Sequence, residues 1–411
     1  MTESPSAGNG LLNRRRLLQM GSAVGVGAIL SPVVAEEPWL RRPGAPSSDY
    51  GQPSHRAHLV RERVNAHPFG PAAGSSSTPL QSLNGTITPN SLHFERHHSG
   101  IPDIDPARHT LTIFGMVDRP LTFNYEALLR YPMQSRILFL ECSGNSYQNT
   151  FPAAADMTAG ELNGLISCAE WTGVPLHYLL EETGIQPASK WVIAEGADAS
   201  SNNRSVPLSL ATEEAMVAIY QNGEPLRGAQ GYPMRLLVPG CEGNLSIKWL
   251  RSLKLMDQPA HTREETSKYT DLMADGIAQQ FSLRMEVKSI ITTPSGKMKL
   301  QEKGVYEISG LAWSGNGEIR TVEVSADGGN SWAEAEIQSG TGRLQPVRFR
   351  IPWRWNGQPA TLQSRAIDTA GNTQPTREQA LKGQSPLVVY HYNGIQSWQV
   401  EHTGRITNVY A

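Results

Sequence analysis

Residues 136–145 constrain the fold more than any other stretch, because an apolar run of strand character ends there at Cys142 and is followed at once by Ser, Gly and Asn. Aliphatic and aromatic runs that close on turn-forming residues are typical of buried strands leading into a tight loop. Cys142 is therefore expected on the lip of a sheet. An isolated cysteine beside a hydrophobic strand is most often a small inert core residue, so a functional role depends on motifs elsewhere in the chain.

The composition is that of a globular protein with two domains of ordinary size and some extensions. Of the 411 residues, 39% are hydrophobic and 18% are charged, and 38 glycines with 28 prolines favour strands and loops over long helices. The formal net charge of −2 leaves no basic footprint for a polyanion, so nucleic acid is not an expected partner.

Three cysteines, Cys142, Cys168 and Cys241, leave at least one free thiol, and the sequence leaves open whether two of them pair. In an exported protein a leftover thiol is open to oxidation, which favours a specific role such as metal ligation. The sequence holds no Cys-x-x-Cys-His haem-attachment motif, so no haem is expected on this chain.

The N-terminus has the three parts of a twin-arginine export signal in order. Three arginines at residues 14–16 precede a short, glycine-rich apolar stretch at residues 21–30, and small residues follow at 33–35. The apolar stretch is too short to span a bilayer as an ordinary helix. We therefore expect residues 1–35 to be a leader and the protein to be periplasmic, without a membrane span, and to be exported already folded with its cofactor inserted.

The texture of the sequence divides the rest of the chain into four segments. Residues 36–88 are rich in Pro, Ser, Arg and Gly and indicate an extended arm on the surface or on a partner. Residues 89–280 alternate short strands and helices, which indicates a mixed α/β domain. Residues 281–395 show evenly spaced strands cut by Asp-Gly and Asn-Gly turns, as in an immunoglobulin-like β-sandwich, and residues 396–411 form a C-terminal tail. The predicted fold class is α+β.

Periodicity predicts individual elements within the two domains. Strands are expected at residues 109–117, 120–123, 136–140 and 190–194 in the first domain and at 304–313, 319–325, 347–353 and 360–368 in the second, with a helix at 125–131 and a turn feeding a helix across 170–180.

Two loops of the first domain carry groups that suit an anionic ligand. Residues 94–98 place Arg and two His just before a Gly/Pro turn, and such donors fit a phosphate or an anionic oxo group. A basic loop paired with Asp103 and Asp105 explains these residues equally well in isolation. Residues 223–250 combine many glycines and prolines with Arg, Ser and Lys, which would hold backbone and anion-binding groups near a ligand.

From about residue 85 to the C-terminus the chain resembles the sulfite oxidase family of molybdenum enzymes. The matching motifs are Cys142-Ser-Gly-Asn, Phe94-x-Arg-x-His-x-x-x-Pro, Pro233-x-Arg and Ser246-x-Lys-Trp. Asp198, which follows a predicted strand, and Tyr269 are similar to an aspartate and a tyrosine of the family. The resemblance implies a molybdenum–molybdopterin cofactor (Mo-MPT) and a sandwich that serves for dimerisation. It also implies Cys142 as the metal ligand, Tyr269 and Arg96 as catalytic residues, and a cofactor-binding set of Phe94, Arg96, His98, Asp198, Gln230, Arg235, Ser246, Ile247 and Lys248.

The chain departs from the sulfite oxidases where they carry several of their cations. Ser146 and Tyr147 stand in place of two arginines, Asn163 stands in place of a lysine, and Gln230 in place of a histidine. Each desolvated charge-assisted contact is worth about 1.5–3 kcal/mol, so fewer cations weaken the attraction for free sulfite.

Within the family, the chain is most similar to the periplasmic sulfane dehydrogenase subunits of bacterial thiosulfate oxidation. This similarity implies oxidation of sulfane sulfur on a sulfur-carrier protein, with oxygen from water and electrons passed to a c-type cytochrome subunit, by a homodimer core of a hetero-oligomer. Two alternatives stay open: a periplasmic dehydrogenase for free sulfite, and a non-catalytic binding protein in which Cys142 pairs with Cys168 or Cys241.

Overall fold

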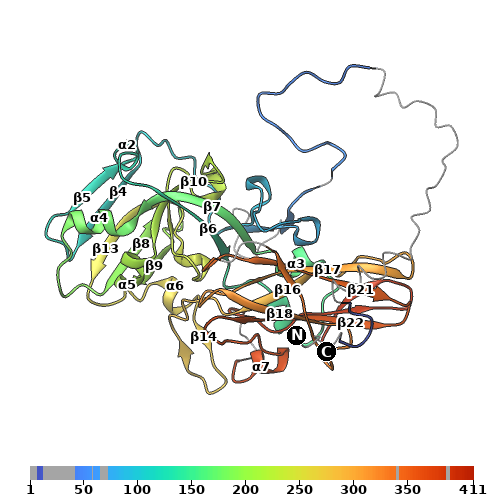
Figure 1. The fold of residues 1–411 in the computed structure, drawn as a ribbon. Helices are drawn as coiled ribbons and strands as arrows, with labels where there is room; N and C mark the ends of the chain where they lie inside the picture. Colours follow the sequence, from blue (N-terminus) through green and yellow to red (C-terminus); the bar gives the residue numbers. More distant parts are fainter. Residues whose placement is uncertain (1–6, 13–41, 58, 65–72, 339–341, 386–388) are drawn as a thin grey trace, which may run out of the picture.

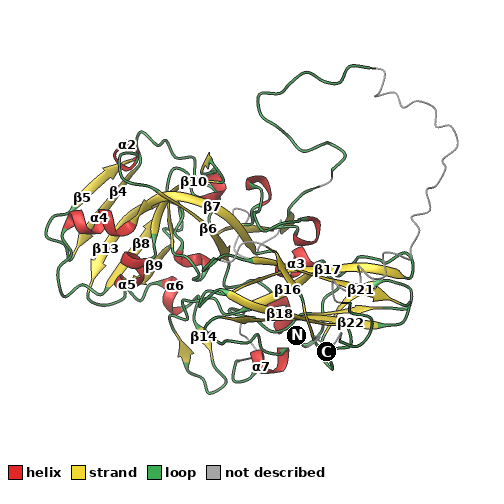
Figure 2. Ribbon diagram, in the orientation of Figure 1, coloured by secondary structure: helices red, strands yellow, loops and turns green. Residues whose placement is uncertain are grey.

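The computed structural model describes residues 7–12, 42–57, 59–64, 73–338, 342–385 and 389–411. In Figure 1 a mixed domain, drawn in green and yellow, lies beside a β-sandwich drawn in orange and red. Strands outweigh the short helices in both parts (Figure 2). The predicted α+β class, with a mixed domain followed by a sandwich, is confirmed.

The first domain contains two five-stranded sheets. One has the order β5-β4-β13-β8-β9, in which only β13 and β4 are parallel neighbours, and the other has the order β11-β10-β7-β6 with β12 also paired to β10. Their bounds are β4 Thr110–Gly115, β5 Leu121–Asn124, β6 Gln134–Glu141, β7 Ile166–Pro175, β8 Trp191–Gly196, β9 Asn203–Pro207, β10 Met216–Gln221, β11 Glu224–Pro225, β12 Arg235–Leu237 and β13 Leu250–Met256. The hairpin β14 Asp271–Leu272 and β15 Ala278–Gln279 follows.

Helix α4, Leu176–Thr183, joins the two sheets of the first domain. Its Leu176, Leu179 and Leu180 are fully buried at the spacing of one helical face, and the helix contacts β4 of one sheet and β7 and β10 of the other. The core of this domain therefore lies between the sheets. The other helices are short: α2 Tyr125–Leu128, α3 Ala159–Asn163, α5 Leu208–Glu213, α6 Arg263–Thr266 and, in the second domain, α7 Arg377–Leu381.

The second domain consists of two sheets with the orders β16-β17-β21-β20 and β19-β18-β22-β23-β24. Trp313, Phe349, Trp353 and Trp398 are at most 1% exposed and belong to one apolar cluster, which is the core of the sandwich. The bounds are β16 Lys288–Thr293, β17 Gly304–Trp313, β18 Ile319–Ser325, β19 Ala333–Glu334, β20 Glu336–Gln338, β21 Val347–Trp355, β22 Ala360–Asp368, β23 Ser397–Val400 and β24 Ile406–Val409.

The predicted arm at residues 36–88 is wrong for its last part. Residues 42–57 are exposed, but β2 Gly74–Ser77 lies between β1 Glu62–Val64 and β3 Glu95–His97 in a small sheet, and Leu80 is buried. A serine-rich run looks like linker by composition, yet its backbone amides pair in a sheet as well as those of any other residue. The arm therefore ends before β2, which pairs with β3 in the segment at residues 94–98.

The predicted tail at residues 396–411 is also wrong. Strands β23 and β24 extend the second sheet of the sandwich, and the Trp398 indole donates to the Ile291 carbonyl across the core at 3.0 Å. The turn expected at the start of residues 170–180 is also wrong. Trp171 and Val174 lie in the long, buried strand β7 instead. Among the described residues, no helix is long and apolar enough to cross a membrane.

Trp398→Ala is expected to lower the free energy of unfolding by about 3–5 kcal/mol, because it removes a fully buried indole from the sandwich core. His402→Ala, in the exposed turn between β23 and β24, is the control and should change stability by less than about 0.5 kcal/mol. Denaturant titration of both variants checks this, and equal small effects would show that the C-terminus is a tail after all.

Candidate functional site

One cavity in the first domain collects the residues that the sequence singled out. Every predicted site residue except Ile247 lines it: Phe94, Arg96, His98, Cys142, Asp198, Gln230, Arg235, Ser246, Lys248 and Tyr269. Ile247 is 1% exposed and belongs to the apolar core of the domain, so its side chain is structural, whereas its neighbours on either side face the cavity.

Cys142 follows the last residue of β6 and begins a tight turn. Its N–H donates to the Leu165 carbonyl at 2.9 Å, and its own carbonyl accepts from Asn145 N–H at 2.9 Å. Burial raises the pKa of the Cys142 thiol, and the Gly144 amide and the Arg96 charge oppose this only in part. Burial thus outweighs the nearby positive charge, so metal binding would have to drive the loss of the proton.

A buried ion pair fixes the residue before Cys142. Glu141 accepts from Lys288 Nζ at 3.1 Å and from the Trp313 indole N–H at 2.6 Å, and both of these partners belong to the sandwich. The Lys288 and Glu141 side chains are 3% and 0% exposed. Because each buried charge has its partner in the other domain, this contact ties the cysteine loop to the sandwich.

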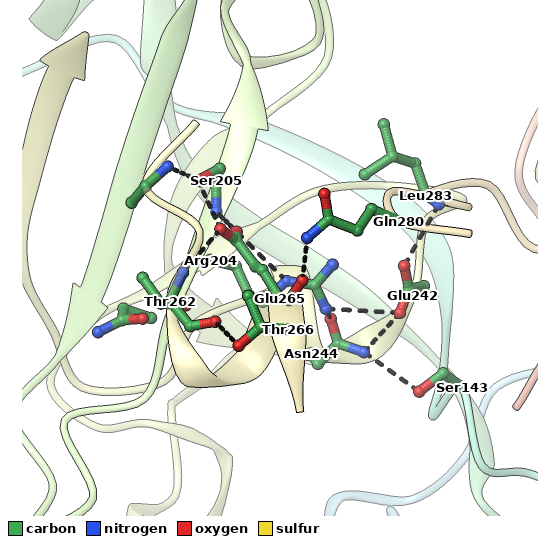
Figure 3. A network of polar contacts seen from close by, with 12 residues as sticks. Ser143, Arg204, Ser205, Glu242, Asn244, Thr262, Glu265, Thr266, Gln280 and Leu283 are labelled. Carbon is green, nitrogen blue, oxygen red and sulfur yellow. Dashed lines mark hydrogen bonds and ion pairs between the residues drawn. The ribbon is translucent and has the colours of Figure 1, made fainter. Parts of the chain in front are cut away.

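A second polar network reaches the cysteine loop from the first domain (Figure 3). Arg204 on β9 is fully buried and donates to Asn244 and, at 3.5 Å, to Glu242. The Asn244 amide donates in turn to Ser143 Oγ at 3.1 Å. Arg204 also lies 3.7 Å from the Glu265 carboxylate on α6, so ionic contacts run from α6 to the residue after Cys142.

The basic side chains of the cavity are held in place by backbone carbonyls. Arg235 donates to the carbonyls of Gln230 and Ser246 at 3.1 and 2.8 Å. Lys248 donates to the Arg96 carbonyl at 3.0 Å and lies 2.8 Å from His97 Nδ1. Burial lowers the pKa of Arg235 to about 9 and holds the pKa of Lys248 well below its usual range, so an anionic ligand would favour the charged form of Lys248.

The loop at residues 94–98 is fixed by neutral hydrogen bonds. The Phe94 N–H donates to Ser167 Oγ at 3.0 Å, and the Phe94 carbonyl accepts from the Gln230 amide at 2.9 Å. Gln230 thus holds this loop in place. On the opposite side, Asp198 accepts from Ser99 Oγ at 3.0 Å and so connects the same loop to the end of β8.

Tyr269 and His98 form a hydrogen-bonded pair in the cavity, with 3.1 Å between Tyr269 Oη and His98 Nε2. Burial and the Arg96 charge lower the pKa of His98 to about 3, and burial raises the pKa of Tyr269. The imidazole is therefore neutral, and its tautomer decides which of the two groups donates. Tyr269 has a φ of 52°, an unusual backbone conformation for a tyrosine, of the kind that clusters at functional sites.

A loop from the sandwich completes the surroundings of Cys142. The Tyr390 ring lies 5.3 Å from that of Tyr269, and the His391 N–H donates to the Ser143 carbonyl at 2.9 Å. The His391 imidazole lies 3.7 Å from the Glu242 carboxylate. These residues, like Lys288 and Arg204, were missed in the sequence because no local motif marks a contact between residues that lie far apart in the chain.

The donor set fits a molybdenum held by a cofactor that brings its own sulfur ligands. Cys142 is the one thiol lining the cavity, and the described residues contain no group of three His, Cys, Asp or Glu placed to hold a metal. Arg235 and Asn202 both line the cavity. Arg235 Nε and Asn202 Oδ1 are buried and have no hydrogen-bond partner among the described residues. A polar ligand there would satisfy them.

Known proteins match both domains. A model described as the oxidoreductase molybdopterin binding domain matches residues 98–264, and one described as the Mo-co oxidoreductase dimerisation domain matches residues 279–396. Mitochondrial sulfite oxidase of Mus musculus is 29% identical over 341 residues, covering 76% of this chain and 61% of that protein. Nitrate reductase [NADPH] of Phytophthora infestans is 30% identical over 322 residues, covering 70% and 35%. The chain thus spans only part of these longer relatives.

The crystal structure of the sulfane dehydrogenase SoxCD from Paracoccus pantotrophus is 42% identical to this chain with a TM-score of 0.89, and the match covers 92% of this chain and 98% of that one. This chain belongs to the sulfite oxidase family of molybdenum enzymes. As a member of this family of oxidoreductases, it carries a molybdopterin-binding domain, which contains most of the cavity, and the family's dimerisation domain as its sandwich.

Apart from Gln230, which lines the cavity, the departures from the sulfite oxidases lie outside the cavity lining of this molybdenum enzyme. Asn163 is buried and accepts from Ser146 Oγ at 2.6 Å, and Ser146 in turn accepts from Lys288. Ser167 is bonded to Thr78 at 2.7 Å. Tyr147 is 38% exposed and packs against Phe151. These replacements therefore remove cations from beside the site, and none of them places a new group in it.

Lys288→Met is expected to destabilise this enzyme by about 3–5 kcal/mol, because Glu141 would keep a buried charge without its partner. The matched control is Lys297→Met, whose 2.7 Å pair with Glu161 is partly exposed and should be worth about 0–1 kcal/mol. Thermal unfolding measures both, and molybdenum content should fall in the first variant alone. Equal effects would contradict the role given to the buried pair.

Stability is expected to fall as the pH rises above neutrality, and His391 should account for part of the fall. Against the effect of burial, Glu242 raises the pKa of His391, so its contribution is complete below the ordinary value of 6.5 and is lost as the pH rises through the raised pKa. Thermal unfolding between about pH 6 and about pH 9 should show a shallower decline for His391→Gln than for the wild type. Parallel curves would contradict this coupling.

Proposed function

We propose that this chain oxidises sulfane sulfur carried on a protein thiol in the periplasm, with oxygen taken from water and electrons passed to a c-type cytochrome subunit. The observation that carries the proposal is the cavity in which Cys142 meets Arg96, Tyr269 and the buried bases Arg235 and Lys248. When bound, the molybdenum cofactor supplies the two-electron chemistry at sulfur. The chain supplies the ligand, the binding wall and the proton-carrying groups.

Different residues of the cavity would bind the metal, bind the cofactor and contact the substrate. Cys142 would ligate the metal, while Arg235, Lys248 and Gln230 hold the wall that faces the cofactor. Arg96 is the cation whose charge acts on the Cys142 thiol, so it is the group best placed to attract an anionic sulfur substrate. Tyr269 stays protonated and can donate its one hydrogen to that substrate in place of its contact with neutral His98.

The sparse positive charge near Cys142 supports a bound sulfane sulfur over free sulfite. Of the cations lining the cavity in the described residues, Arg235 and Lys248 already donate to backbone carbonyls. A free dianion would find few uncommitted cations, whereas a substrate tethered to a protein does not depend on charge for its local concentration. The 42% identity to a protein named as a sulfane dehydrogenase supports the same substrate class.

The proposed compartment and partners rest on sequence and similarity. The arginines at residues 14–16 lie outside the described residues and support export of a folded, cofactor-loaded enzyme. A separate cytochrome c as electron acceptor is supported by the lack of a Cys-x-x-Cys-His motif in this sequence. The match of residues 279–396 to a dimerisation domain supports a homodimer core.

Cys142→Ser is expected to lower turnover by at least the 10–100-fold typical of losing a group that supports a metal, since a harder oxygen ligand changes the metal's electronics. Cys168→Ser, at a buried thiol that does not line the cavity, is the matched control and should keep most of the activity. A Cys142→Ser enzyme with more than about a tenth of wild-type turnover would sink the assignment.

Steady-state assays decide the substrate. With cytochrome c as acceptor, kcat/KM should be about tenfold or more higher for a thiosulfate-loaded carrier protein than for sulfite, a difference of about 1.4 kcal/mol in transition-state binding. The unloaded carrier protein is the control and should give no turnover. An equal or higher value for sulfite would favour a free-sulfite dehydrogenase of the same fold.

A further inference from the structure

Residues 7–12, which precede the three arginines, lie against the sandwich as a loop (Figure 1, dark blue). Leu11 forms an antiparallel bridge with Trp353 on β21. Leu12 N–H donates to the Pro352 carbonyl at 2.9 Å, and Arg354 N–H donates to the Gly10 carbonyl at 2.8 Å. The segment thus makes backbone hydrogen bonds on both sides of the bridge.

The segment occupies one side of a part of β21 where no other strand of the described residues pairs. On one side β17 pairs with the whole of β21, but on the other side β20 reaches only Arg348, Phe349 and Arg350. The edge at residues 352–354 would otherwise present unpaired backbone groups, which are a template for an incoming strand.

Side chains make this contact specific. Leu11 is 1% exposed and belongs to the core cluster of the sandwich. The Trp353 indole donates to the Asn9 carbonyl at 2.9 Å, and the Asn9 amide donates to the Ala326 carbonyl at 2.6 Å. Gly10 has a φ of 90°, and a Cβ there would lie 2.2 Å from the Arg354 carbonyl oxygen. A buried leucine after an obligatory glycine is a recognition pattern that a chance contact would not require.

We propose that the edge of β21 at residues 352–354 is a binding site for residues 7–12, so that the folded sandwich holds the segment that precedes the three arginines. The residues that receive the segment lie between 326 and 354, so the site exists only once the sandwich has folded. If residues 1–35 are the leader that the sequence predicts, docking ties that leader to a completed C-terminal domain. Its removal would then uncover the edge of β21. The docking itself does not depend on the catalytic proposal.

The test compares full-length Leu11→Asp with full-length Leu12→Asp, which carries the same change at the neighbouring, only partly buried leucine. Hydrogen exchange of the Arg354 amide is measured by mass spectrometry. In Leu11→Asp the amide should exchange about tenfold or more faster than in the wild type, the effect of losing about 1.4 kcal/mol of local stability. In Leu12→Asp the rate should stay near that of the wild type.

Gly10→Ala provides a second, uncharged variant, since the added methyl group meets the Arg354 carbonyl. It should speed exchange at Arg354 as Leu11→Asp does, while exchange on β17, which pairs with the other side of β21, stays unchanged. Wild-type rates at Arg354 in both Leu11→Asp and Gly10→Ala, or an equal acceleration in Leu12→Asp, would overturn the proposal. Turnover is expected to be the same in all four proteins, so failure here leaves the proposed function intact.

Discussion

The buried ion pair between Glu141 and Lys288 is the contact on which the site depends. Glu141 ends β6 immediately before Cys142, and Lys288 begins β16 in the other domain, with 3.1 Å between the charged atoms. Both side chains are buried away from water, so loss of either partner leaves an uncompensated charge. The position of a residue that would ligate the metal is therefore set by the sandwich as much as by its own sheet.

Other contacts extend the same principle around the cysteine loop. Ser143 receives a hydrogen bond from Asn244, which Arg204 holds from β9, and its carbonyl receives one from His391 of the sandwich. The Tyr390 ring packs near Tyr269 from the same loop. Side chains of the first domain and of the sandwich thus restrict the movement of the cysteine loop, which is the arrangement that precise metal chemistry needs. The dimerisation-type domain is in this sense part of the site.

Much of the fold and of the site could be predicted from the sequence, and the exceptions have physical causes. Local signals marked β6 and its terminal cysteine, because an apolar run followed by turn residues has few other structures. Composition misjudged residues 74–77, because serine backbones pair in a sheet while their side chains suggest a linker. It also misjudged residues 396–411, where the short strands are polar apart from Trp398 and a few aliphatic residues. No local pattern marks Lys288 as a residue near the site, since its partner Glu141 lies far away in the chain. Ile247 lies inside a motif that matches the family, but its side chain packs in the core.

The account's central claim is that Cys142 is the protein's ligand to molybdenum, and X-ray absorption at the molybdenum edge tests it most directly. Spectra of the wild type and of Cys142→Ser, both purified with metal bound, give the number of sulfur neighbours around the metal. We predict one sulfur neighbour fewer in Cys142→Ser, with an oxygen neighbour in its place or an open position. The same sulfur coordination in both proteins would contradict the claim and leave Cys142 as a buried thiol at the edge of the site.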